Sequence, residues 1–212
     1  ALLAGESDEA FRVASRAPLS ALSPNTRRRV AEILNALAES DIASGQLTLA
    51  RNTALRAGHF WTDSLNHKIL ARISLGESDT PAAVGHLLSA LKLSGADPQA
   101  NYLTGKILFS QARFSEAKPH LQSAYAGRIS ASGVSDAGRY TPADLPLMLG
   151  RIHYVEKTFS MAYALLNEYA QDPANQVPSD VLEMLARSAV AGGRPGDALD
   201  WFDRRLVIGD DE

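Results

Sequence analysis

A spaced pair of small residues recurs five times along the chain, and this repeat limits the possible folds more than any other feature. In each copy a small residue is followed twelve positions later by an alanine. The pairs are Ala38 and Ala50, Ala71 and Ala83, Gly105 and Ala117, Gly150 and Ala162, and Ala186 and Ala198. We call the first residue of each pair the packing position. A recurrence of this kind predicts a stack of similar structural units rather than one irregular core.

Composition indicates that these units are helical. The sequence holds 34 alanines and 28 leucines against 17 valines and isoleucines combined. Alanine and leucine lead the ranking of helix formers, whereas β-branched residues favour strands. The chain is therefore expected to be all-α.

The spacing fits two antiparallel helices per unit. Small residues allow the two backbones to approach, and an apolar residue four positions after the second alanine fills the space between neighbouring units. That residue is Ala54, Leu87, Leu121, Leu166 and Phe202 in the five copies. Turn-forming glycines stand between the paired positions, at Gly45, at Gly76 and in the Gly192–Gly196 run.

Successive packing positions lie 33, 34, 45 and 36 residues apart. With two helices per unit, this period resembles the tetratricopeptide repeat (TPR) family over residues 31 to 207, most faithfully from Asn101 to Ala124. The leading tryptophan of that family is absent from every unit, which leaves a related helical-hairpin solenoid as the alternative. The resemblance implies a right-handed superhelical solenoid of antiparallel helix hairpins.

The repeat divides the chain into four parts. Residues 1–24 are expected to hold the second helix of a truncated hairpin and a connector, so we expect further repeats upstream to stack on it. Residues 25–126 are expected to form three hairpins, and residues 142–212 two more with the C-terminal end. The long 45-residue period places an inserted loop at 127–141, either a spacer or a binding edge.

The sequence offers no pattern typical of catalysis or of cofactor binding. There is no cysteine, and the five histidines are not spaced as metal ligands. A phosphate-binding loop and a nucleophile elbow are also missing. We therefore predict a protein that is not an enzyme, with no metal and no cofactor.

Charge and hydropathy narrow the choice of partners. The formal net charge of −3 argues against a general nucleic-acid binder. No uncharged stretch approaches the roughly 20 apolar residues that a membrane span needs. A protein or peptide partner is the remaining expectation.

The resemblance also implies where a partner binds. In the family, the residue after the packing position faces a concave groove, and here it is Glu39, Arg72, Lys106, Arg151 and Arg187. Four of these five are basic in a net acidic chain, which favours an acidic or carboxylate-bearing partner. Side chains one turn away complete the predicted groove, namely Asn35, Lys68, Tyr102, Phe109 and Tyr154.

The sequence thus predicts a protein-interaction scaffold that binds a partner segment in its groove. Adjacent repeats of a longer parent chain are also expected partners. The alternative is the TPR region of a bacterial cell-envelope protein that organises secretion or exopolysaccharide export and assembly. That alternative favours the periplasm or cell envelope over the cytoplasm.

Overall fold

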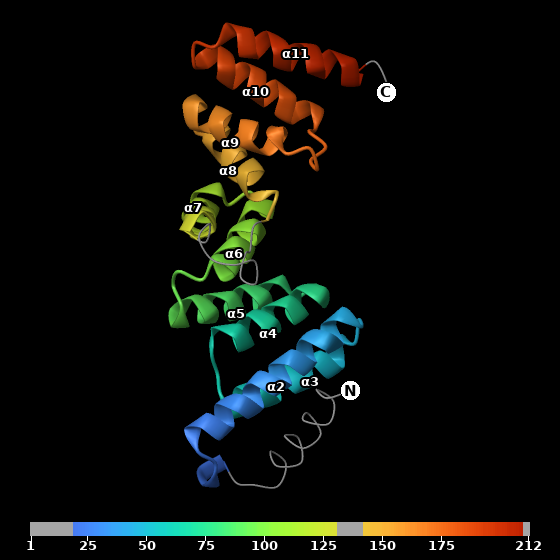
Figure 1. The fold of residues 1–212 in the computed structure, drawn as a ribbon, viewed down its shortest axis with the longest axis vertical. Helices are drawn as coiled ribbons and strands as arrows, with labels where there is room; N and C mark the ends of the chain where they lie inside the picture. The colour runs from blue at the N-terminus through green and yellow to red at the C-terminus, as the bar shows by residue number, and fades with distance from the viewer. Residues whose placement is uncertain (1–18, 131–141, 210–212) are drawn as a thin grey trace. The chain divides into compact units, whose positions relative to one another are not determined.

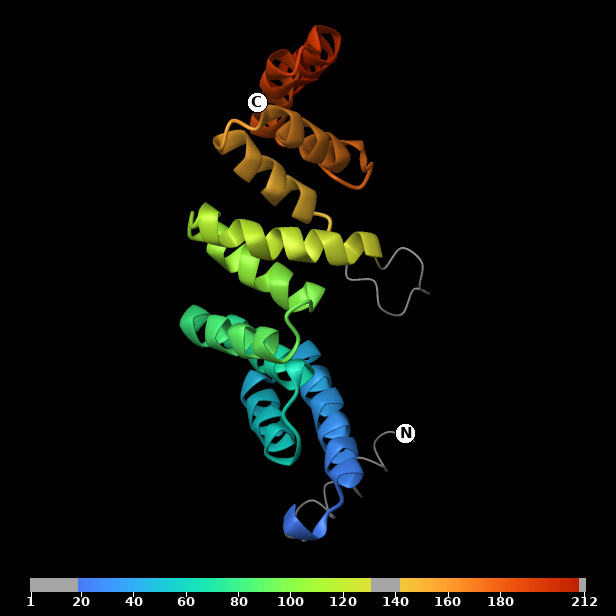
Figure 2. The ribbon, with the colours of Figure 1, turned by 90° about the vertical axis from the view of Figure 1, so that its left-hand side faces the viewer.

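The computed structural model describes the backbone of residues 19–130 and 142–209 and the side chains of residues 19–127 and 142–206. The elements in these ranges are a short 3-10 helix and ten α-helices (Figures 1 and 2). They are η1 (Leu19–Ala21), α2 (Pro24–Ala43), α3 (Leu47–Phe60), α4 (Ser64–Gly76), α5 (Thr80–Leu93), α6 (Pro98–Ser110), α7 (Phe114–Ser130), α8 (Leu145–Val155), α9 (Phe159–Gln171), α10 (Ser179–Ala191) and α11 (Pro195–Gly209).

The chain forms two compact units, Ala1–Ala100 and Asn101–Glu212, so the boundary falls inside α6. The half-hairpin expected near the N-terminus lies outside the described residues, as does most of the expected inserted loop. Helix α7 continues to Ser130, so the first four residues of the segment predicted as a loop at 127–141 are helical.

Within each unit, consecutive helices pack as antiparallel hairpins. Helix α2 packs on α3 and α4 on α5 in the N-terminal unit, while α8 packs on α9 and α10 on α11 in the C-terminal unit. Helix α6 lies beside α7 in both views (Figures 1 and 2). The predicted all-α fold of repeated helical hairpins is confirmed.

Each hairpin in the described residues reverses through one residue with a left-handed backbone, always seven positions after the packing position. These residues are Gly45, Ser78, Ala112, Lys157 and Gly193, with φ of 74°, 62°, 57°, 60° and 71°. The next amide closes the turn, as in the 2.9 Å bond from the Thr158 amide to the His153 carbonyl. Gly76 was expected in such a turn but is the last residue of α4, and Ser78 adopts the left-handed conformation instead.

Glycine is required at two packing positions because the opposing helix carries a leucine. A Cβ on Gly105 would lie 2.6 Å from Cγ of Leu121, and a Cβ on Gly150 would lie 2.6 Å from Cδ2 of Leu166. Both distances are well inside van der Waals contact, so only glycine permits the observed approach of the two helices.

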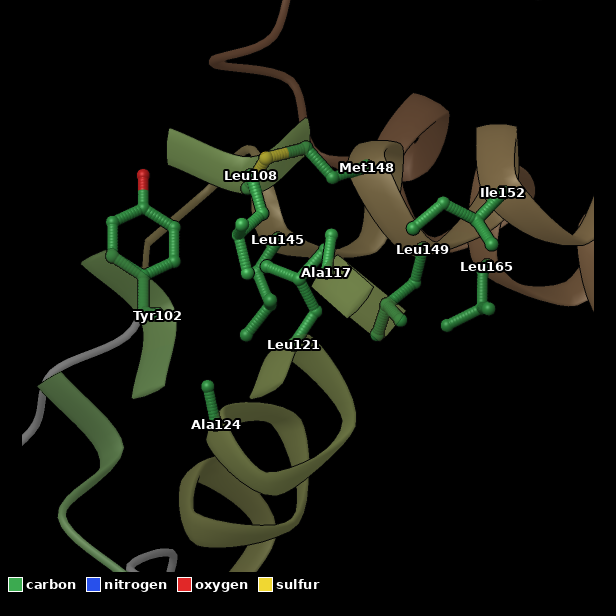
Figure 3. Packing of buried hydrophobic residues seen from close by; sticks show 10 residues of the cluster. All are labelled: Tyr102, Leu108, Ala117, Leu121, Ala124, Leu145, Met148, Leu149, Ile152 and Leu165. Atoms are coloured by element: carbon green, nitrogen blue, oxygen red, sulfur yellow. The ribbon is translucent and has the colours of Figure 1, made fainter. Parts of the chain in front are cut away.

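The core of the C-terminal unit extends from one hairpin to the next. Leu121 of α7 is buried together with Leu145, Leu149 and Ile152 of α8 (Figure 3). Apolar burial therefore joins successive hairpins as well as the two helices inside each hairpin.

Candidate partner-binding face

The first helices of the C-terminal hairpins, α6, α8 and α10, each present three residues on one side. They stand three before, one after and four after the packing position, a spacing that places them on a common helix face. We call this set the A-helix face, and it consists of Tyr102, Lys106 and Phe109 on α6, Leu147, Arg151 and Tyr154 on α8, and Glu183, Arg187 and Val190 on α10.

A closed polar network joins the α6 part of this face to the start of α8. The Tyr102 hydroxyl donates to Oδ1 of Asp144 at 2.6 Å, and Nζ of Lys106 donates to Oδ2 at 2.7 Å. Burial of Tyr102 and its hydrogen bond to Asp144 raise the pKa of the Tyr102 phenol. The phenol therefore stays protonated at any physiological pH.

Asp144 is the N-cap residue of α8, yet its side chain makes no capping hydrogen bond. By contrast, the side chain of Asp63 at the start of α4 accepts a hydrogen bond from the backbone N–H of Asn66 at 2.9 Å, as N-cap residues usually do. Both carboxylate oxygens of Asp144 instead bind side chains of α6. This aspartate therefore serves the contact between hairpins rather than the start of its own helix.

The ion pair recurs one hairpin later. Arg151 of α8 lies 2.7 Å from Asp180, which precedes the next packing position by six residues, as Asp144 does. Arg187 of α10 pairs with Glu183 on its own helix at 2.5 Å. The three cations of the A-helix face are therefore each paired with a carboxylate, two of which, Asp144 and Asp180, lie outside the set.

Apolar and aromatic side chains border this row of charges. Phe109 contacts Phe114 with ring centroids 5.2 Å apart, and Tyr154 contacts Phe159 at 5.8 Å. Val190 is 59% exposed. These side chains can bury apolar area of a partner while the charges orient it.

Two predicted residues of the N-terminal unit, Asn35 and Lys68, are little available to a partner. Asn35 is buried and accepts a hydrogen bond from Asn66 at 3.0 Å. Lys68 pairs with Asp97 at 2.8 Å, and Arg72 with Glu39 at 3.3 Å. Lys68 and Asp97 side chains are only 16% and 12% exposed, so this pair contributes mainly to packing.

Every basic residue predicted for the groove thus has an acidic partner within the chain. The prediction of a basic row missed Asp144 and Asp180, which neutralise it in the C-terminal unit. A signal was present, because both aspartates precede a packing position by six residues. The predicted binding residues themselves remain a prediction.

Within residues 19–130 and 142–209, no group of three or more histidine, aspartate or glutamate side chains is placed to hold a metal ion. None of the helices in the described part of the chain is both long and apolar enough to span a bilayer.

No protein-family model and no curated protein matches the sequence. Solved structures do match. YrrB, described as a TPR protein with an unusual peptide-binding site, is 15% identical with a TM-score of 0.65, over 85% of this chain and 87% of that chain. MamA (residues 41 to the end) from Desulfovibrio magneticus RS-1 is 15% identical with a TM-score of 0.61, over 86% and 96% of the two chains. PilW, a widely conserved type IV pilus biogenesis factor, is 21% identical with a TM-score of 0.56, over 85% and 78%. At these identities the likeness concerns the fold.

Proposed function

We propose that this chain, which has a tetratricopeptide-repeat fold, is a non-catalytic scaffold that binds a segment of another protein on its A-helix face. The observation that carries the proposal is a combination that recurs on α6, α8 and α10. Each helix presents a cation held in an ion pair beside an exposed or half-exposed apolar side chain. The description of YrrB as peptide-binding supports the same use of this fold.

Preorganisation gives the face its binding capacity. The ion pairs Lys106–Asp144 and Arg151–Asp180 hold flexible side chains in place before a partner arrives. Binding then costs less entropy, because the receptor side chains are already ordered.

The acidic partner expected from the sequence has to compete with Asp144 and Asp180 for the same cations. A carboxylate that replaces an existing carboxylate gains little net energy in exposed surroundings. We therefore infer that the side chains of Tyr154 and Val190 supply most of the affinity and that the charges select the register.

The test is selection of peptides from a random display library on the immobilised chain, followed by binding measurements with variants. Tyr154→Ala with Val190→Ala is expected to weaken binding of the selected peptides at least tenfold. Leu49→Ala with Leu55→Ala, which truncates two exposed leucines of α3, is the matched control. Peptides that bind both variants equally would contradict the proposal.

Salt dependence separates the two contributions. Replacing Arg151 and Arg187 with alanine is expected to change which peptides are selected and to reduce the sensitivity of binding to salt. If affinity collapses in this variant while Tyr154→Ala has no effect, the charges rather than the apolar side chains carry recognition.

A second candidate keeps the fold and places the chain in a bacterial cell envelope, as part of a secretion or export assembly. The likeness to PilW, a pilus biogenesis factor, favours it. Fractionation of cells that express the native gene tests this candidate, and recovery solely in the cytoplasm would reject it.

A further inference from the structure

Helices α4 and α5 pack on each other (Figure 1) and bring two histidines together. His67 of α4 stands four residues before the packing position Ala71, and His86 of α5 stands fifteen residues after it. The centres of the two imidazole rings are 6.0 Å apart, and the ring planes are inclined by 32°. Because the two residues are far apart along the chain, only the packing of the two helices makes them neighbours.

Two other hairpins fill the same two positions with side chains that satisfy each other. In the α6/α7 hairpin the positions hold Asn101 and His120, whose side chains hydrogen-bond at 3.0 Å. In the α10/α11 hairpin they hold Leu182 and Trp201, which belong to one apolar cluster. The packing of the repeat therefore does not require two histidines at these positions.

The two imidazoles of α4 and α5 make no hydrogen bond to any part of the chain that the structure describes. Nδ1 of His67 is buried and has no partner. Buried polar atoms are nearly always hydrogen-bonded, and a bound ion is one explanation of an exception. A neutral imidazole carries one nitrogen lone pair, so each ring keeps an acceptor available to a ligand.

The separation of the rings suits one shared transition-metal ion. Zinc lies about 2.1 Å from a coordinating imidazole nitrogen and hence about 3.2 Å from the centre of that ring, so two rings that share one ion have centres at most about 6.4 Å apart. The 6.0 Å between His67 and His86 is within this limit. A tetrahedral angle at the ion needs about 5.2 Å. Small rotations of the two half-buried side chains can supply the difference.

The charged groups that act on these rings favour a cation between them. Asp63 acts on the ring of α4, and Asp79 acts on the ring of α5. Arg51 is the opposing charge near the α5 ring, but its guanidinium is paired with Glu77. The local balance of charge is therefore negative, which attracts a metal ion.

We propose that His67 and His86 form a binding site for a divalent transition-metal ion such as Zn²⁺, which links α4 to α5. Imidazole nitrogen is a preferred ligand of such ions. Two protein ligands leave the other coordination positions to water or to a donor group of another molecule. The prediction of no metal was based on spacing along the sequence, whereas this pair arises from the packing of two helices. The site lies in the N-terminal unit and does not depend on partner binding at the A-helix face.

The experiment titrates the intact chain with Zn²⁺ alone and follows binding by isothermal titration calorimetry. His67→Asn, which copies the asparagine and histidine of α6/α7, is expected to weaken binding at least tenfold, because one imidazole alone cannot chelate the ion. His86→Gln should weaken binding equally, and the double variant should lose little more, since the two rings act as one chelate. His59→Asn, which alters an exposed histidine of α3, is the matched control and should leave the affinity unchanged. Circular dichroism confirms the fold of each variant.

A second readout is local to the N-terminal unit. Saturating Zn²⁺ is expected to raise the urea midpoint of a single-tryptophan chain that retains Trp61, because the ion binds the folded hairpin. His67→Asn should abolish this increase, and His59→Asn should retain it. Mg²⁺ is expected to leave the midpoint unchanged, because it prefers oxygen ligands.

Three results would overturn the proposal. One is the absence of saturable Zn²⁺ binding at millimolar concentrations. Another is equal affinity in His67→Asn, His86→Gln and the unaltered chain, because other groups would then hold the ion. The third is a response to Mg²⁺ as strong as the response to Zn²⁺, which would assign the ion to carboxylates rather than imidazoles. Weakened binding in both histidine variants, with full binding in His59→Asn, supports the proposal.

Discussion

The α4/α5 hairpin and the α8/α9 hairpin share one repeat pattern but fill it with different chemistry. Five residues before the packing position, α4 buries Asn66 and α8 buries Leu145. At the packing position itself, α4 has Ala71 and α8 has Gly150. The same interior position can therefore hold either an apolar side chain or a polar side chain whose hydrogen bonds are all formed.

Burial of the polar Asn66 side chain in α4 depends on complete hydrogen bonding. The side-chain amide nitrogen Nδ2 of Asn66 donates to the Asn35 side-chain oxygen at 3.0 Å and to the Ala54 carbonyl at 2.8 Å. In α8 the equivalent leucine needs no such partner. The two units can be probed separately, because Trp61 lies in the N-terminal unit and Trp201 in the C-terminal unit.

The largest expected change in stability concerns the buried asparagine pair of the N-terminal unit. Asn66→Leu, which copies α8, leaves the buried oxygen of Asn35 without its donor and should destabilise the N-terminal unit by about 3 kcal/mol. Urea unfolding of a single-tryptophan chain retaining Trp61 measures this loss. Asn35→Leu with Asn66→Leu should recover part of it, because both partners are then apolar. A double variant less stable than Asn66→Leu alone would refute this account of the buried pair.

A smaller loss is expected from the reverse exchange in the C-terminal unit. Gly150→Ala, which copies α4, places a Cβ 2.6 Å from Cδ2 of Leu166 and 3.2 Å from the Leu166 backbone nitrogen. Overpacking of this kind costs about 2 kcal/mol. Unfolding followed through Trp201 reports the change. Gly196→Ala is the control, since nothing lies within 4 Å of a Cβ there.

A stabilising effect of about 1 kcal/mol is expected where non-glycine residues hold the left-handed turns. Lys157→Gly should raise the free energy of unfolding by relieving the Cβ clash at φ of 60°. Lys157→Ala is the control, because it removes the rest of the side chain but keeps the Cβ at φ of 60°. Equal effects of the two substitutions would show that turn strain is not the cause.

The smallest effect concerns pH. Burial lowers the pKa of His67 and of His86, whose rings are 6.0 Å apart on α4 and α5, and proximity to His67 lowers the pKa of His86 further. A folded-state pKa below the unfolded value means that stability is full above about pH 6.5 and falls as the pH drops below it. His86→Gln should flatten this fall in the Trp61-monitored transition between pH 7 and pH 5. An unchanged slope would show that other groups cause the pH dependence.

The sequence by itself determined the helical class, the number of hairpins in the described residues and the alignment of one repeat with the next. These follow from the spacing of Ala38, Ala71, Gly105, Gly150 and Ala186, because close helix packing requires a small residue at a fixed period. It also placed the turns to within a few residues. It could not decide that Ser78 rather than Gly76 would adopt the left-handed conformation, since a turn is closed by hydrogen bonds from both helices.

Only the tertiary structure decided how the candidate sites are charged and which faces are covered. A cation seen as free in sequence, such as Lys106 or Arg151, acquires its carboxylate from the next hairpin, 38 or 29 residues away along the chain. Leu199 and Leu206 of α11 are likewise exposed, whereas the equivalent positions of α9, Tyr163 and Ala170, contact the following hairpin. Local spacing determines which residues share a helix face, whereas contacts between hairpins determine what that face meets.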